Sequence, residues 1–317
     1  MPERTIMSVK AVFEEFTALV REEKLPIECV AIADGEEILC EAHFKADLPR
    51  NIYSHTKSYM TTACGIAIDE GLLSLDTRLV DLFPEAVPEN ADERLQLITL
   101  KNLLTMSSGF GKGLLMGADR RAGTGYPDYI RYMFSQPMMY MPGSRFDYST
   151  ADSILAGRMV EKVTGRTLGA YLYEKVFSKL GQGWPIWETD TEGHQIGGGG
   201  MFMKLSDMLK IGQVYLNGGT WHGERIVSAD WVKQASSLQI STGENPDNDI
   251  WRCGYGFQFW MLPYSGAYRA DGAYGQITAV LPEQGLVISF QCPEDGNFDE
   301  VKQIVNTKLF SPVIGLG

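Results

Sequence analysis

The stretch NIYSHTKSYMTTACGIAIDEG, residues 51–71, decides the fold of this chain. A polar tetrapeptide, SHTK at 54–57, opens a run that is otherwise almost wholly apolar and has the length of a helix. Gly71 stands where such a helix would end, because glycine readily adopts the left-handed conformation that often follows a last helical turn. The run therefore predicts a buried helix with a serine and a lysine at its N-terminal mouth.

Ser54 and Lys57 are three residues apart, so on a helix their side chains lie on one face and can touch. Burial disfavours the charged form of a lysine, and a neutral amine beside a hydroxyl is a base beside a nucleophile. In the alternative interpretation, Ser54 caps the helix and Lys57 extends its amine to water. The S-x-x-K spacing alone does not decide, because chance matches are expected in a long chain. His55 would face away from Ser54, and we expect a structural or pocket-lining role for it.

The composition is that of a globular protein with a sizeable core, since 44% of its 317 residues are hydrophobic and 21% are charged. Its net charge of −12 argues against nucleic acids and anionic membranes as partners, because the long-range field has the wrong sign. The five cysteines include no CxxC pair, and the N-terminus has no apolar run of signal-peptide length. We therefore expect a cytoplasmic protein with reduced thiols and no membrane span.

Strand-like patterns lie near both ends of the chain and helical patterns lie between them. Two β-rich runs flank the turn signal Asp34-Gly35, and residues 255–262, 274–281 and 286–292 resemble strands. The predicted fold class is α+β, an antiparallel sheet flanked by helices with an inserted, mostly helical subdomain. The sheet domain would comprise residues 1–71 and 226–317 and the helical subdomain residues 72–225, with the active site at their interface.

Two further stretches could contribute to a site. Tyr148 lies just ahead of a helix whose start is signalled by Ser149 and Asp152 as a capping box, so its hydroxyl could project into a cleft. The alternative is a half-buried core tyrosine. Gly272 and Gly275 enter a strand whose backbone could approach a substrate closely, or they form an ordinary turn.

Other chemistries have little support in the sequence. There is no G-x-S-x-G elbow, HExxH, P-loop or GxGxxG motif, and the four histidines show no metal-binding spacing. The glycines at 197–200 could cradle an anion, or they form a flexible loop.

Five ordered segments resemble the serine β-lactamase-like superfamily, in the branch of class C β-lactamases, D-alanyl-D-alanine carboxypeptidases, family VIII esterases and 6-aminohexanoate-dimer hydrolases. These segments are SHTKSYMTTACGIAIDEGLLSLD at 54–76, LITLKNLLTMSSGF at 97–110, PGSRFDYSTADSILAGRMVEKVTG at 142–165, GGGGMFMKLSDMLKIGQVYLNGG at 197–219 and RADGAYGQITAVLPEQGLVI at 269–288. The resemblance implies that Ser54 is the acylated nucleophile and Lys57 its proton acceptor, while Tyr148 shares acid and base duty. It also implies an oxyanion hole made by the backbone N–H groups of Ser54 and Ala273, and no metal or organic cofactor.

The sequence departs from the family pattern at two motifs. Thr150 stands where β-lactamases have the asparagine of Tyr-x-Asn, and the strand motif K-T-G reads ADG at 270–272. The cation that holds a β-lactam or peptide carboxylate is therefore absent, unless Arg269 or Arg252 replaces it. The candidate pocket residues are Thr150, Arg269, Asp271 and Gly272.

These departures favour a carboxylesterase or small-amide hydrolase acting on a small-molecule substrate. Two alternatives remain: a β-lactamase or penicillin-binding DD-peptidase, and a scaffold that keeps the fold without catalysis.

Overall fold

The largest sheet joins the two ends of the chain. The computed structural model describes residues 3–245, 249–294 and 298–315. Six strands are hydrogen-bonded in the order β2-β1-β11-β10-β9-β8, and their pairs are antiparallel. They are β1 (Cys29–Ala33), β2 (Ile38–His43), β8 (Trp260–Met261), β9 (Tyr268–Gly272), β10 (Gln276–Leu281) and β11 (Leu286–Gln291). The α+β class and the shared sheet are confirmed.

Turn chemistry explains where these strands end. Asp34 accepts hydrogen bonds from the backbone N–H groups of Glu36 and Glu37, which closes the predicted hairpin after β1. The strand predicted over 255–262 is confirmed only near its end, where Trp260–Met261 pairs with β9 as β8. Gln258 interrupts it with a left-handed φ of +68°, and its side-chain amide donates to backbone carbonyls of the helical region instead.

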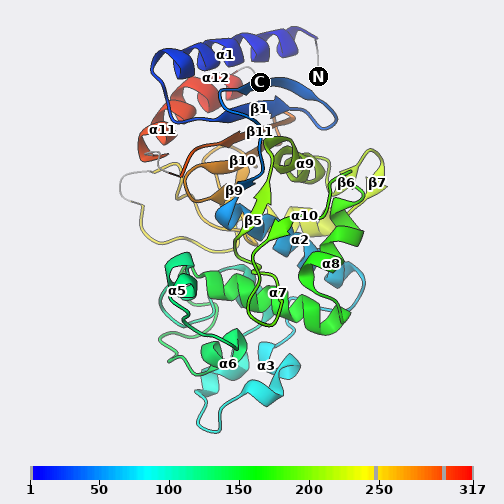
Figure 1. Cartoon of the computed structure of the whole chain (residues 1–317), viewed down its shortest axis with the longest axis vertical. Coiled ribbons are helices and arrows are strands. Elements are labelled where there is room, and N and C mark those ends of the chain that lie inside the picture. Colours follow the sequence, from blue (N-terminus) through cyan, green and yellow to red (C-terminus); the bar gives the residue numbers. More distant parts are fainter. Residues whose placement is uncertain (1–2, 246–248, 295–297, 316–317) are drawn as a thin grey trace.

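Helices cover both faces of the sheet (Figure 1). On one face lie α1 (Glu3–Glu22), α11 (Phe298–Val305), the π-helical turn η5 (Asn306–Phe310) and α12 (Ser311–Ile314). On the other face lies α9 (Leu205–Leu216), whose leucines meet the small residues of β1. A Cβ at Gly212 would come within 2.6 Å of Val287 on β11, so glycine permits this close packing.

The remaining helices form a second layer below the sheet in Figure 1. They are α2 (Thr56–Asp69), α3 (Leu79–Leu82), α4 (Leu100–Leu104), α5 (Gly117–Arg121), α6 (Tyr129–Phe134), α7 (Thr150–Thr164), α8 (Leu168–Leu172) and α10 (Ala229–Ala235). Shorter turns are η1 (Tyr53–His55), η2 (Pro84–Ala86), η3 (Glu93–Leu97) and η4 (Tyr173–Phe177). Two small sheets, β3-β5-β4 and β6-β7, comprise β3 (Arg50–Asn51), β4 (Ile186–Trp187), β5 (Met201–Met203), β6 (Thr220–Trp221) and β7 (Glu224–Arg225).

Helix α2 is the link between the two layers. It packs against α7 and α8 of the helical layer and also contacts β9 of the sheet. Helix α9 belongs by sequence to the range 72–225, yet it packs on β1, β10 and β11. The division into domains at residues 71 and 226 therefore stays a prediction.

No helix in the described part of the chain combines the length and apolar character needed to cross a membrane.

Candidate active site

Ser54 lies in the 3₁₀ turn η1, which leads directly into α2. The turn is held by Asn51, whose side-chain oxygen accepts a hydrogen bond from the backbone N–H of Tyr53 at 2.9 Å. Tyr53 itself has a left-handed φ of +47°. Ser54 is half-buried, whereas the helix α2 that follows it is buried along almost its whole length. This explains why a polar group opens an otherwise apolar run.

Lys57 is buried, with 1% of its surface exposed. Its Nζ donates to Ser54 Oγ at 3.2 Å and to the carbonyl oxygen of Gly198 at 2.6 Å. The amine therefore contacts the serine, as the three-residue spacing predicts. The alternative in which Lys57 extends to water is wrong.

Burial lowers the pKa of Lys57 from 10.5 to about 7. The positive charge of Arg120 lowers this pKa further, and the carboxylate of Asp152 raises it. Near neutral pH, Lys57 is consequently a neutral amine in a substantial fraction of the molecules, and this is the form that accepts a proton.

His55 is fully buried and its Nε2 lies 2.8 Å from the hydroxyl of Thr278 on β10. Burial lowers the pKa of His55 to about 3, so the ring is neutral at physiological pH. Its position between α2 and the sheet fits the expected structural role.

Tyr148 lies in the segment that precedes α7, beside Lys57. Its ring stacks on Trp260 with centroids 5.6 Å apart and meets Tyr255 edge-on at 6.3 Å. The Lys57 Nζ lies 5.1 Å from the centroid of the Tyr148 ring. Desolvation raises the pKa of Tyr148 above its ordinary value, the negative charge of Asp271 adds to this rise, and hydrogen bonding to Ser54 opposes it. Tyr148 is therefore a neutral phenol at rest.

The capping box predicted for α7 is wrong. Ser149 Oγ accepts a hydrogen bond from the backbone N–H of Leu114 at 3.1 Å. Asp152 Oδ1 accepts one from Ser108 Oγ at 2.8 Å. Asp152 is fully buried, and burial raises its pKa to about 7. The pattern that resembled a helix cap thus places an acid close enough to Lys57 to shift its pKa.

The glycines at 197–200 are buried, so the flexible-loop interpretation is wrong. A Cβ at Gly197 would come within 2.6 Å of the carbonyl oxygen of Ser153, and a Cβ at Gly198 within 2.7 Å of the Thr150 methyl group. The run lies directly against the start of α7 and presents the Gly198 carbonyl to Lys57. Thr150 is buried in this contact, and its hydroxyl lies 3.3 Å from the sulfur of Met116.

The end of β9 approaches the Ser54 turn closely. A Cβ at Gly272 would clash with the carbonyl oxygen of Ile52, so only glycine fits this crossing. Ala273 follows in an exposed turn, and the next residue, Tyr274, has a left-handed φ of +61°. The structure thus brings the turn that carries Ala273 to the turn that carries Ser54.

Arg269 does not offer its charge to this site. Its guanidinium donates to Asp271 at 2.7 Å and to the backbone carbonyls of Trp251 and Met261, and only 2% of the side chain is exposed. Arg252 is exposed. Asp271, half-buried beside Arg269, influences the pKa of Tyr148.

Arg120, a buried arginine on α5, was not among the residues expected from the sequence. It forms an ion pair with Glu188 at 3.0 Å and donates to the carbonyl oxygen of Leu115 at 2.8 Å. A Cβ at Gly199 would lie 3.9 Å from its Nη2, and its charge lowers the pKa of Lys57. No spacing or motif in the sequence distinguishes Arg120 from an exposed arginine.

The chain is similar in sequence to proteins named as a hydrolase and an esterase. A 6-aminohexanoate-dimer hydrolase from Paenarthrobacter ureafaciens is 25% identical over 289 residues, which cover 84% of this chain and 73% of that enzyme. Lovastatin esterase from Penicillium rubens is 28% identical over 224 residues, which cover 60% of this chain and 55% of the esterase. This chain thus spans about half the length of lovastatin esterase.

The fold is also found in solved structures. EstCE1, a hydrolase with promiscuous acyltransferase activity, superposes with a TM-score of 0.76 at 17% identity, covering 97% of this chain and 99% of EstCE1. At this identity the likeness concerns the fold. The sequence model of the beta-lactamase family matches residues 27–305, and the chain therefore belongs to the beta-lactamase family.

Proposed function

We propose that the chain is a serine hydrolase that forms an acyl-enzyme on Ser54 and cleaves small carboxylic esters or unactivated amides. One observation carries the proposal. The buried amine of Lys57, with a pKa lowered to about 7, lies 3.2 Å from the Ser54 hydroxyl. A base poised near the working pH and within hydrogen-bond reach is what a serine nucleophile needs.

In the proposed acylation, neutral Lys57 accepts the Ser54 proton while Oγ attacks the substrate carbonyl carbon. The oxyanion that forms is stabilised by the backbone N–H groups of Ser54 and Ala273. When the intermediate collapses, Tyr148 donates its phenolic proton to the departing alcohol or amine. Lys57 then passes the proton that it took from Ser54 to the Tyr148 phenolate, so the leaving group carries the phenolic proton and Tyr148 is a neutral phenol again.

Deacylation reverses these roles. A water molecule attacks the acyl carbonyl and gives its proton to the Lys57–Tyr148 pair. Ser54 then leaves with a proton from the same pair. The raised pKa of Tyr148 supports this assignment, because a neutral phenol at rest is an acid and leaves the role of base to Lys57.

The substrate class follows from what the site lacks and from its relatives. Arg269 is engaged by Asp271 and two carbonyl groups, so it is unavailable to hold the carboxylate of a β-lactam or a peptide. Relatives named as an esterase and as a 6-aminohexanoate-dimer hydrolase point to esters and amides. These features favour esterase or amidase activity over β-lactamase or DD-peptidase activity.

We also propose that the protein acts in the cytoplasm. All five cysteines are described and are free thiols, as in proteins of a reducing compartment.

The test is intact-protein mass spectrometry after incubation with a fluorophosphonate probe. We expect one adduct on the parent, none on Ser54→Ala, and an unchanged adduct on Ser58→Ala, which alters a buried serine one turn further along α2. The parent enzyme is next assayed with p-nitrophenyl esters, short amides and nitrocefin. A folded parent protein that takes no adduct and turns over no substrate would favour the non-catalytic scaffold. Efficient nitrocefin turnover would restore the β-lactamase alternative.

A further inference from the structure

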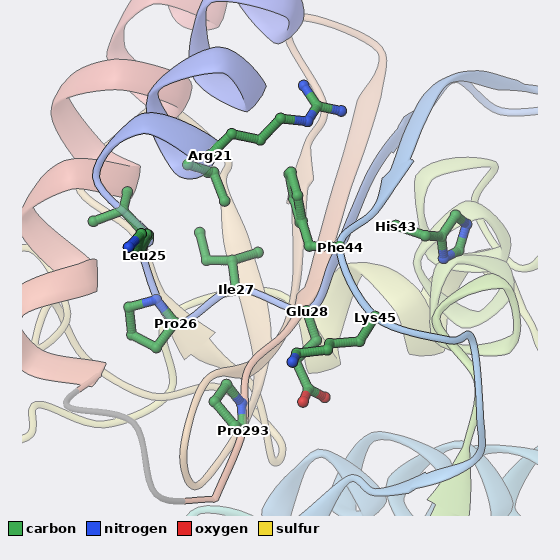
Figure 2. Close-up of a pocket in the computed structure, with 11 residues that line it drawn as sticks. Arg21, Leu25, Pro26, Ile27, Glu28, His43, Phe44, Lys45 and Pro293 are labelled. Atoms are coloured by element: carbon green, nitrogen blue, oxygen red, sulfur yellow. The ribbon is translucent and has the colours of Figure 1, made fainter.

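Three metal-ligating side chains meet at one end of the β1–β2 hairpin, away from Ser54. Cys29, the first residue of β1, pairs directly with His43, the last residue of β2. Directly opposed residues of an antiparallel pair place their side chains on the same face. Figure 2 shows that His43 points away from Phe44, as alternation along a strand requires. Asp47 follows four residues later, on the connection to β3.

The donor atoms are close enough to share one ion. One ligand atom from each of Cys29, His43 and Asp47 can be chosen so that all three lie within 4.8 Å of one another. Ligands about 2.0–2.3 Å from a tetrahedral zinc ion are roughly 3.3–3.8 Å apart, so a small inward movement would complete the geometry.

Two independent features point to a cation here. Asp47 Oδ1 is buried and has no hydrogen-bond partner among the described residues, a costly state that a bound cation would relieve. Glu41, on the same face of β2, places a carboxylate oxygen 3.7 Å from His43 Nε2. At this distance the contact is an ion pair and not a hydrogen bond; a slightly closer approach would let the Glu41 carboxylate orient a ligating imidazole, with Nδ1 turned to the ion.

We propose that Cys29, His43 and Asp47 bind one divalent transition-metal ion, zinc(II) by the chemistry of the donors. A thiolate and an imidazole select such ions over magnesium and calcium, which prefer oxygen ligands. The Cys29 thiol loses its proton as the sulfur–metal bond forms, and a water molecule supplies the fourth ligand. The bound ion would join the sheet to the segment that leads through Arg50 to the Ser54 turn, and its fourth position would stay open to water.

The neighbourhood fits such a fastening and gives access from solvent. Arg50 on β3 forms an ion pair with Glu28, the residue before Cys29, so the same two segments already meet beside the proposed site. Access comes from His43, which is exposed. The neighbouring cavity of about 800 Å³ lies on the Phe44 side, and the His43 ring points away from it in Figure 2. Sequence spacing carries no metal signal here, because strand pairing brings the ligands together.

The test is cobalt(II) titration of protein freed of metal with a chelator. We expect saturation at one equivalent, tetrahedral absorption bands and a thiolate-to-cobalt charge-transfer band that Cys29→Ser loses. Cys40→Ser is the matched control, because Cys40 lies on β2 but packs with the opposite, α1-side cluster. His43→Gln and Asp47→Asn change more exposed ligands and should weaken binding if Cys29→Ser fails to fold. Glu41→Gln should weaken it about 10-fold through the orientation of His43.

Zinc should also raise the melting temperature of the parent and not that of His43→Gln. Fluorophosphonate labelling of Ser54 is a separate readout and does not depend on this result. The proposal is overturned if no saturable binding occurs at one equivalent. It is equally overturned if the charge-transfer band survives in Cys29→Ser and disappears in Cys40→Ser.

Discussion

The rings of Tyr53 and Tyr274 meet edge to face, with their centroids 5.1 Å apart. Each tyrosine has a left-handed backbone and each adjoins a residue expected to donate to the oxyanion: Tyr53 precedes Ser54, and Tyr274 follows Ala273. Such conformations cost about 1–3 kcal/mol in non-glycine residues and persist where the surroundings enforce them. The ring contact therefore helps to hold the turn that carries Ser54 and the turn that carries Ala273 in a fixed relative position.

Removing this contact should weaken oxyanion stabilisation. We expect Tyr274→Ala to lower kcat/KM for ester hydrolysis about 10-fold, less than the 10²–10³-fold cost of losing a donor outright. Tyr274→Phe keeps the ring and should retain most of the activity. Steady-state kinetics on a p-nitrophenyl ester distinguishes them, and equal losses in both variants would assign the effect to the hydroxyl instead.

A substitution at Gly272 tests whether the close approach of β9 to the Ser54 turn is needed for acylation. Because a Cβ at Gly272 would clash with the Ile52 carbonyl oxygen, Gly272→Ala must separate the two segments. We expect acylation by a fluorophosphonate to slow by about 10²-fold, as for a displaced oxyanion donor.

The control for Gly272→Ala is Gly285→Ala. Gly285 has a left-handed φ of +65° in the β10–β11 turn, and a Cβ added there would have no described atom within 4 Å beyond its chain neighbours. This substitution should cost roughly 1 kcal/mol of stability through backbone strain and leave the acylation rate unchanged. Equal loss of acylation in both variants would show that Gly272 acts through general stability.

Local pattern was enough to predict part of the site. The three-residue spacing of Ser54 and Lys57 predicted their contact, because neighbours on a helix face are fixed by helix geometry alone. The turn signal at Asp34-Gly35 and the strand patterns near both ends likewise predicted the hairpin and the individual strands, since each depends on residues close in sequence. Their union in one sheet pairs β1 with the distant β11 and followed from layer packing instead.

The residues that sequence reasoning missed are those placed by tertiary contacts. Asp152 satisfies a capping pattern in sequence, but the buried Ser108 hydroxyl binds it instead. Gly198 reaches Lys57 only because the run at 197–200 packs against α7. Arg120 is buried in an ion pair with Glu188, which is far away in sequence. No local rule encodes these encounters.

The proposed role of the Tyr148 hydroxyl as an acid can be tested without disturbing the aromatic ring. Tyr148→Phe keeps the stack on Trp260 and removes the proposed acid, so we expect kcat to fall by about 10²-fold. Tyr255→Phe is the control in the same aromatic cluster, because the Tyr255 hydroxyl is buried and makes no hydrogen bond to any described residue. A loss below threefold in Tyr148→Phe would demote this tyrosine to a packing role.

The pH dependence of acylation should follow Lys57. If the neutral amine is the base, as proposed, the rate should rise with pH through about 7 and then level off. Asp152 raises the pKa of Lys57, so Asp152→Asn should shift the midpoint to lower pH. Asp190→Asn changes an acid paired with Arg158 and should leave the midpoint in place. A midpoint that moves upward in Asp152→Asn would contradict the assigned base.

The buried Lys57 should also lower the free energy of unfolding at low pH, because its charged form is disfavoured in the folded protein. Its pKa is about 7 in the folded protein and 10.5 ordinarily, so between these values the unfolded chain holds more protons than the folded one. Stability from this group therefore rises with pH across that window, and below pH 7 the full penalty applies.

Lys57→Met removes the free-energy penalty of burying the charged lysine, because each tenfold change in an acid dissociation constant corresponds to about 1.4 kcal/mol. We expect the variant to be more stable than the parent at pH 6, with the difference shrinking as the pH approaches 10.5. The Gly198 carbonyl loses its donor in Lys57→Met, which subtracts a constant amount, so the slope of the difference is the diagnostic quantity. Urea denaturation across this pH range measures it, with the exposed Lys101→Met as the control. A difference that is flat with pH would mean that Lys57 keeps its proton in the folded protein, and the proposed base would then have to be sought elsewhere.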